Sequence, residues 1–128
     1  MMLLLDSQVV LWVLDDNPRL GADARNTIGS APGVFVSAAT VWELTIKSML
    51  GKLSVPADLA GHLVEQGFAP LNVNAEDAEA IRDFPELARH DPFDRLLVAQ
   101  AHRAGLSLLT ADRVLLKLDR DFVVDATV

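Results

Sequence analysis

The sequence predicts one α/β domain over residues 1–128, with a short parallel sheet of about five strands and helices on both faces. Short apolar runs alternate along the chain with longer segments whose apolar residues recur at helical spacing. Strands separated by helices pair in parallel, because each helix returns the chain to the starting edge of the sheet. The 128 residues, 51% hydrophobic and 23% charged, are enough for one buried core.

In the first half of the chain, apolar runs predict the strands and helical spacing predicts the helices. The expected elements are strands at 3–5 and 33–37 and helices at 7–14, 22–28, 40–50 and 56–66. The strand at 33–37 is the clearest, because it is β-branched and aromatic after a Pro-Gly pair. The turn cluster Asp15-Asp16-Asn17-Pro18 ends the first helix. Gly51 is placed to end the helix at 40–50, and Pro56 to open the next one.

The second half of the chain continues the alternation. The expected elements are strands at 68–73, 107–110 and 122–124 and helices at 74–84, 92–104 and 112–118. Pro70 interrupts the first of these strands, and Asn74 is placed to cap the helix after it. Asp91 and Pro92 are typical of an N-cap and a first helical residue, and Gly105 follows the end of that helix.

Composition limits the kinds of site and partner. The chain has no cysteine and three histidines, so oxygen ligands for a hard cation are favoured. A net charge of −7 argues against long-range attraction to nucleic acid, although a bound metal would offset acids that gather in one site. No apolar run approaches the ~20 residues of a membrane span, and the first residues do not resemble a signal peptide. We therefore expect a cytoplasmic protein without membrane contact.

Four acidic residues, Asp6, Glu43, Asp94 and Asp112, stand where predicted strands end or predicted helices begin. In a doubly wound sheet, such positions meet at the carboxyl ends of the strands, where the strand order reverses. Two carboxylates about 4 Å apart repel by ~4 kcal/mol at an effective dielectric of about 20. A fold that gathers several of them therefore needs a cation. Mg²⁺ suits such a cluster, because it takes few carboxylates and leaves positions for water and phosphate oxygens.

Each acid also has a purely structural explanation. Asp6 and Asp112 are placed to cap the helices that follow them, which stabilises a helix by about 0.5–2 kcal/mol. Glu43 is placed to pair with Lys47 one turn later, or to form a capping box with Thr40. The joint placement of the acids is what favours a metal site over these separate roles.

The densest polar cluster is His90-Asp91-Pro92-Phe93-Asp94-Arg95. Asp91 is explained as a helix cap, and Asp94 gains from the helix dipole, which keeps its carboxylate ionised. His90 is expected to be a flanking hydrogen-bonding residue rather than a ligand. Arg95 is expected to pair with Asp91 or to reach a phosphate.

Segments along nearly the whole chain carry a family resemblance. They lie at residues 4–7, 10–12, 36–39, 42–47, 51–53, 90–101 and 109–112, and the run from 91 to 101 is the most specific. In these segments the chain resembles the PIN-domain ribonucleases, and within them the VapC-like toxins of type II toxin–antitoxin pairs. Ser7-Gln8 stands where Thr-His or Thr-Asn is more usual, which leaves the substrate preference open.

The resemblance implies a PIN domain that cleaves RNA endonucleolytically with Mg²⁺ or Mn²⁺. It assigns Asp6 and Asp94 as the principal metal ligands, with Glu43 and Asp112 completing the acidic pocket. It also implies a homodimer held in check by a cognate antitoxin, and an acidic pocket predicts a basic residue on that partner. The expected supporting and phosphate-binding residues are Ser7, Thr110, Asp91, Lys47, Lys52, Arg89, Arg95 and Arg113.

An alternative from another class is a doubly wound signalling or binding module that holds Mg²⁺ without cutting RNA. Phosphoacceptor receiver domains have this design, but they need an adjacent acidic pair after the first strand. Asp6-Ser7-Gln8 offers one acid only. A catalytically degenerate PIN domain is a second alternative, although all four acids are present.

Overall fold

Five parallel strands form one sheet in the computed structural model, which describes residues 1–128. The strands are β1 (Leu3–Leu5), β2 (Val34–Ser37), β3 (Ala69–Leu71), β4 (Ser107–Thr110) and β5 (Val123–Asp125). Their order is β3-β2-β1-β4-β5, so the strand order reverses between β1 and β4. Pro70 lies in the edge strand β3, where a missing backbone N–H is tolerated. The predicted parallel sheet is confirmed.

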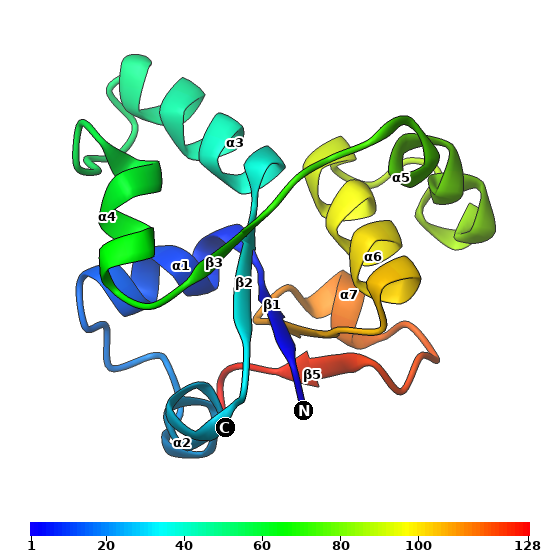
Figure 1. Cartoon of the computed structure of the whole chain (residues 1–128). Coiled ribbons are helices and arrows are strands. Elements are labelled where there is room, and N and C mark those ends of the chain that lie inside the picture. The colour runs from blue at the N-terminus through cyan, green and yellow to red at the C-terminus, as the bar shows by residue number, and fades with distance from the viewer.

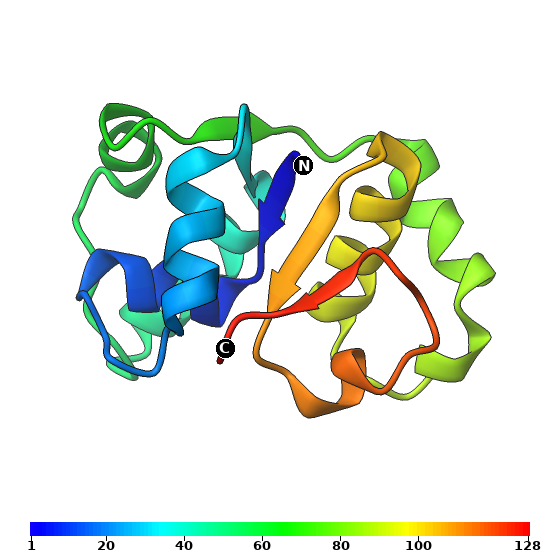
Figure 2. The same ribbon diagram turned by 90° about the horizontal axis from the view of Figure 1, so that it is seen from below.

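Seven α-helices cover the two faces of the sheet. They are α1 (Ser7–Leu14), α2 (Ala22–Ser30), α3 (Ala38–Met49), α4 (Leu59–Glu65), α5 (Ala75–Glu79), α6 (Pro92–Ala104) and α7 (Arg113–Leu116). Figures 1 and 2 place α1 to α4 on one side of the sheet and α5 to α7 on the other. None of these helices is both long and apolar enough to cross a membrane.

The alternation of side chains along β1 divides the core between the two faces. Leu3 and Leu5 belong to the cluster formed with α1 to α4, whereas Leu4 belongs to the cluster formed with α6, α7 and the segment before α6. All three leucines are fully buried. Because successive strand residues point to opposite faces, a central strand covered on both sides has to be apolar throughout.

Two helix starts differ from the sequence prediction by two residues or more. α3 begins at Ala38 rather than at Thr40, because the Ser37 hydroxyl at the end of β2 accepts a hydrogen bond from the Ala39 amide and caps the helix there. α4 begins three residues after Pro56, because Asp58 is its N-cap. In both places a capping side chain, rather than the apolar spacing or a proline, determines where the helix begins.

The helix expected over 74–84 is interrupted. Asn74 caps α5 in a capping box, but α5 ends at Glu79 and is followed by the 3₁₀ turns η1 (Ala80–Asp83) and η2 (Pro85–Leu87). Pro85 disfavours an α-helical conformation at Phe84, which ends η1, but it does not explain why α5 already ends at Glu79. Phe84 and Leu87 are buried under α6 and anchor these turns to the core.

Candidate active site

An open pocket of about 500 Å³ lies at the carboxyl ends of β1 and β4, where the strand order reverses. Five acids and two bases are among its lining residues: Asp6, Glu43, Asp91, Asp94, Asp112, Lys47 and Arg19. The structure therefore brings together the four acids that the sequence placed at element ends. They come from four separate segments of the chain, which only the fold makes neighbours.

Asp6 follows β1 directly and is almost completely buried, with 4% of its surface exposed. Its Oδ1 accepts a hydrogen bond of 2.7 Å from the Ser7 amide, and its Oδ2 accepts one of 2.5 Å from the Thr110 hydroxyl. Burial raises the pKa of Asp6, these two hydrogen bonds lower it, and the negative charges of Asp112 and Glu43 raise it further. Asp6 is thus both a helix cap and a carboxylate held in a fixed orientation.

Glu43 lies in the second turn of α3 and is also buried. Its Oε1 accepts a hydrogen bond of 2.6 Å from the Ser7 hydroxyl, and its Oε2 is 2.7 Å from the Lys47 ammonium group. The predicted pair with Lys47 is confirmed. The capping box with Thr40 is wrong, because α3 begins before Thr40. The hydrogen bond that Lys47 donates to Glu43 raises the pKa of Lys47, which therefore stays charged at the pocket.

Asp94 lies in the first turn of α6, where Asp91 is the N-cap as predicted and accepts hydrogen bonds from the Phe93 and Asp94 amides. Burial raises the pKa of Asp94 to about 8, and the negative charges of the four other pocket acids add to this effect. The helix dipole therefore does not suffice to keep this carboxylate ionised, contrary to expectation. The first cause is burial, and the negative charges of the surrounding acids add to it.

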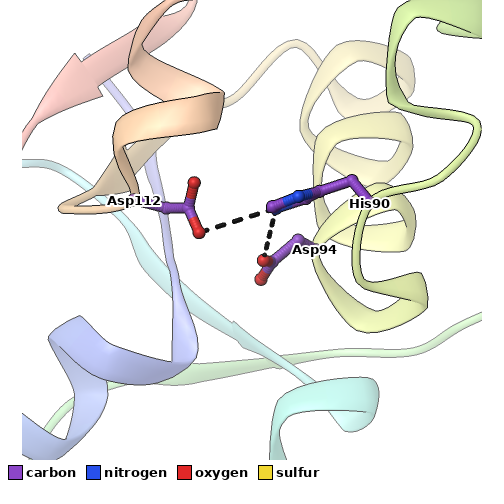
Figure 3. Close-up of side chains that lie close together, drawn as sticks. All are labelled: His90, Asp94 and Asp112. Carbon is purple, nitrogen blue, oxygen red and sulfur yellow. Dashed lines mark hydrogen bonds and ion pairs between the residues drawn. The ribbon is translucent and has the colours of Figure 1, made fainter.

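Asp112 is the N-cap of α7, and its Oδ1 accepts hydrogen bonds from the Val114 and Leu115 amides. Its Oδ2 points the other way, toward the imidazole of His90 (Figure 3). Thr110, at the end of β4, connects the two sides of the site, because its hydroxyl donates to Asp6 and accepts from the Asp112 amide.

The site meets a simple test for a divalent cation. Several carboxylate oxygens face one pocket, and two of the acids, Asp6 and Asp94, have raised pKa values because they are buried among negative charges. Of the two basic residues in the lining, Lys47 forms an ion pair with a pocket acid, Glu43. A hard cation bound by the carboxylates would supply the missing positive charge, so the residues present fit such an ion.

Four basic residues that the sequence suggested for phosphate binding lie outside the pocket lining. Arg95 donates from Nη1 to the Ala88 carbonyl and braces the segment before α6, and it does not line the pocket. Lys52, Arg89 and Arg113 also lie outside its lining. That any of these four binds RNA stays a prediction.

Two polar residues of the site, Arg19 in the pocket lining and His90 beside it, are not marked as site residues by the sequence. Arg19 reaches the pocket from the connection between α1 and α2, where no sequence pattern marks it. His90 lies 3.0 Å from Asp94, as the spacing of one helical turn allows, but its approach to Asp112 depends on the fold.

The sequence matches the PIN domain family over residues 3–121. The chain belongs to this family. Among the curated proteins compared by sequence, none matches significantly. The expected PIN fold is confirmed, and all four acids of the predicted site lie within the matched region of this PIN domain.

Solved structures share the fold of this PIN domain at low sequence identity. A DNA-bound VapBC from Salmonella typhimurium has a TM-score of 0.64 at 18% identity, covering 98% of this chain and 96% of that one. A toxin–antitoxin complex from Klebsiella pneumoniae has a TM-score of 0.63 at 13% identity, with 94% and 98% covered. FitAcB from Neisseria gonorrhoeae has a TM-score of 0.60 at 23% identity, with 87% and 88% covered.

Proposed function

We propose that this PIN domain is a Mg²⁺- or Mn²⁺-dependent endoribonuclease and the toxin of a type II toxin–antitoxin pair. The observation that carries the proposal is the meeting of Asp6, Glu43, Asp94 and Asp112 in one pocket at the strand-order reversal. Membership of the PIN family and the toxin–antitoxin complexes that share the fold support the same function.

The carboxylates of Asp6, Asp94 and Asp112 are the groups that would hold the ion. A bound divalent ion polarises a scissile phosphate and lowers the pKa of an attacking water. The pKa of about 8 at Asp94 means that this group releases a proton when a cation takes its place. Asp112 keeps one oxygen free for the pocket because the other caps α7.

Glu43 and Lys47 supply a second function in the same pocket. Both oxygens of Glu43 are engaged, one by Ser7 and one by Lys47, so the glutamate holds the ammonium group at the pocket wall. A charged group held there can bind a phosphate next to the scissile one without being reoriented during the reaction. Ser7 contributes by fixing the Glu43 side chain.

The test is cleavage of cellular RNA by the purified protein with Mg²⁺, with Mn²⁺ and with a chelator. We expect cleavage only with a divalent ion, and a loss of roughly 10²-fold or more in Asp6→Asn and in Asp94→Asn. Asp58→Asn is the matched control, because Asp58 also caps a helix but lies outside this pocket. Cleavage by Asp94→Asn at the parent rate would show the proposal to be wrong.

The proposed partners follow from the same site. A cognate antitoxin would inhibit the enzyme by placing a basic side chain among the pocket acids, where it would replace the charge of the cation. We also expect the toxin to form a homodimer. Co-purification with the product of a small neighbouring reading frame, and loss of cleavage in that complex, would test the antitoxin. Light scattering of the toxin alone would test the dimer.

A further inference from the structure

His90 lies between two acids of the pocket (Figure 3). Its Nε2 is 3.0 Å from Oδ2 of Asp94 and 3.5 Å from Oδ2 of Asp112. These three ligand atoms all lie within 4.8 Å of one another, and they form the only such group of His, Asp and Glu side chains in the structure. Asp6 and Glu43, which line the same pocket, do not belong to this close group.

The imidazole is held in place by the segment that precedes α6. The His90 amide donates a hydrogen bond of 2.9 Å to the Leu87 carbonyl, and Arg95 donates to the carbonyl of Ala88. Leu87 itself is almost fully buried. His90 is thus attached to the core through Leu87, and its side chain, 19% exposed, turns toward Asp94 and Asp112.

The two separations from the His90 nitrogen match those of atoms that share one small cation, and the third is at most 4.8 Å. With bonds of about 2.1 Å, neighbouring ligand atoms are about 3.0 Å apart in an octahedral site and about 3.4 Å apart in a tetrahedral one. The two distances from His90, 3.0 and 3.5 Å, lie close to this range. The imidazole nitrogen is therefore already where a ligand of an ion held by Asp94 and Asp112 would stand.

We propose that His90 is a nitrogen ligand, through Nε2, of the ion held by Asp94 and Asp112, and that it makes the site prefer a transition-metal ion such as Mn²⁺ over Mg²⁺. This inference rests on the metal site proposed above and changes its composition from oxygen donors alone to oxygen plus nitrogen. Imidazole binds divalent transition metals better than it binds Mg²⁺, whose preferred ligands are carboxylates and water. The competing arrangement is an imidazole that only hydrogen-bonds the two acids and leaves when the ion binds.

The two arrangements differ in an observable that does not depend on RNA cleavage. Mn²⁺ is paramagnetic, so electron spin echo envelope modulation detects a nitrogen nucleus bonded to it. The sample is the full chain with one equivalent of Mn²⁺. Because the chain has three histidines, the double variant His62→Gln/His102→Gln leaves His90 as the one imidazole. Labelling histidine with ¹⁵N then identifies any nitrogen signal as that of His90.

We expect nitrogen coupling in the parent and in the single-histidine variant, a change of that coupling on ¹⁵N-histidine labelling, and its loss in His90→Gln. By calorimetry, we expect the ratio of Mn²⁺ to Mg²⁺ affinity to fall by about tenfold or more in His90→Gln. His62→Gln alone is the matched control for both measurements, since His62 lies on α4 outside the pocket.

A Mn²⁺ complex without nitrogen coupling would overturn the proposal, as would coupling that persists in His90→Gln or a failure of the parent to bind Mn²⁺. If His90→Gln does not fold, the labelled single-histidine variant still decides the question. Nitrogen coupling in a protein that cleaves no RNA would retain the inference and refute the nuclease. RNA cleavage that is lost in Asp94→Asn, together with a Mn²⁺ complex that shows no nitrogen coupling, would retain the nuclease and refute His90 as a ligand.

Discussion

The Thr110 hydroxyl donates a hydrogen bond of 2.5 Å to Oδ2 of Asp6 and so joins the ends of β4 and β1 at the strand-order reversal. This bond favours the charged form of Asp6 and opposes the effect of burial on its pKa. We expect Thr110→Val to weaken Mn²⁺ binding by roughly 10–100-fold, the usual effect of removing a group that orients a ligand. Calorimetric titration would measure this loss.

Thr110→Ser is the control for this prediction, because serine keeps the hydroxyl at the same place in the chain. We expect its Mn²⁺ affinity to stay close to that of the parent. Equal affinities for the valine and serine variants would mean that the hydrogen bond does not prepare Asp6 for an ion.

The raised pKa of Asp94 predicts how the stability of the metal-free protein depends on pH. The pKa of about 8, caused first by burial and then by neighbouring acids, lies above the ordinary value of 3.8. The protonated carboxyl of Asp94 contributes fully to the free energy of unfolding below pH 3.8. This contribution is lost as the pH rises to about 8, because over this range the folded protein keeps a proton that the unfolded chain has released. In a chelator, Tm should therefore fall between pH 5 and pH 8.

Asp94→Asn replaces the titrating carboxyl with an amide and should flatten the dependence of Tm on pH. At pH 8 we expect this variant to melt roughly 3–8 °C above the metal-free parent, since it avoids a buried charge among acids. Differential scanning calorimetry at several pH values measures both quantities, with Asp58→Asn as control. Parallel curves for Asp94→Asn and the parent would contradict the assignment of the pH dependence to Asp94.

Lys47 is predicted to serve the substrate rather than the fold. Its side chain is 44% exposed, so its pair with Glu43 is expected to add only about 0–1 kcal/mol to the free energy of unfolding. Lys47→Met should instead lower RNA cleavage by roughly 10²-fold, since it removes a charge held ready for a phosphate. Steady-state cleavage of a labelled oligonucleotide measures this. Lys117→Met, which removes an exposed lysine outside the pocket, should cleave like the parent, and equal losses in the two variants would refute the role of Lys47.

The sequence predicts the elements well where local signals agree. The helix from Asp91 as N-cap to Gly105, which adopts a left-handed φ of 68°, follows the prediction at both ends because cap, proline and glycine point to the same bounds. Where signals compete, it fails. Pro56 suggested a helix start, but the Asp58 carboxylate satisfies a backbone amide and starts the helix later.

The residues of the site also divide into those that the sequence predicts and those that it does not. Asp6 and Asp112 could be predicted because they end neighbouring strands, and parallel pairing alone brings such positions together. His90 and Arg19 could not, since each lies in a connection whose path depends on tertiary packing. The pKa of Asp94 differs from the sequence expectation for a related reason. A helix dipole is a local effect, whereas this pKa is raised first by burial and then by acids from three other segments of the chain and from its own N-cap.

Trp42 and Phe93 connect the two helices that carry Glu43 and Asp94. Their rings meet edge to face, with centroids 5.1 Å apart and an interplanar angle of 70°. Since each ring directly precedes a pocket acid, the contact joins α3 to α6 next to the site. A double-mutant cycle with Trp42→Ala and Phe93→Ala should give a coupling of about 0.5–1.5 kcal/mol in urea unfolding. Each variant should also lose Mn²⁺ affinity, and additive unfolding energies with unchanged affinity would mean that the ring contact does not position the acids.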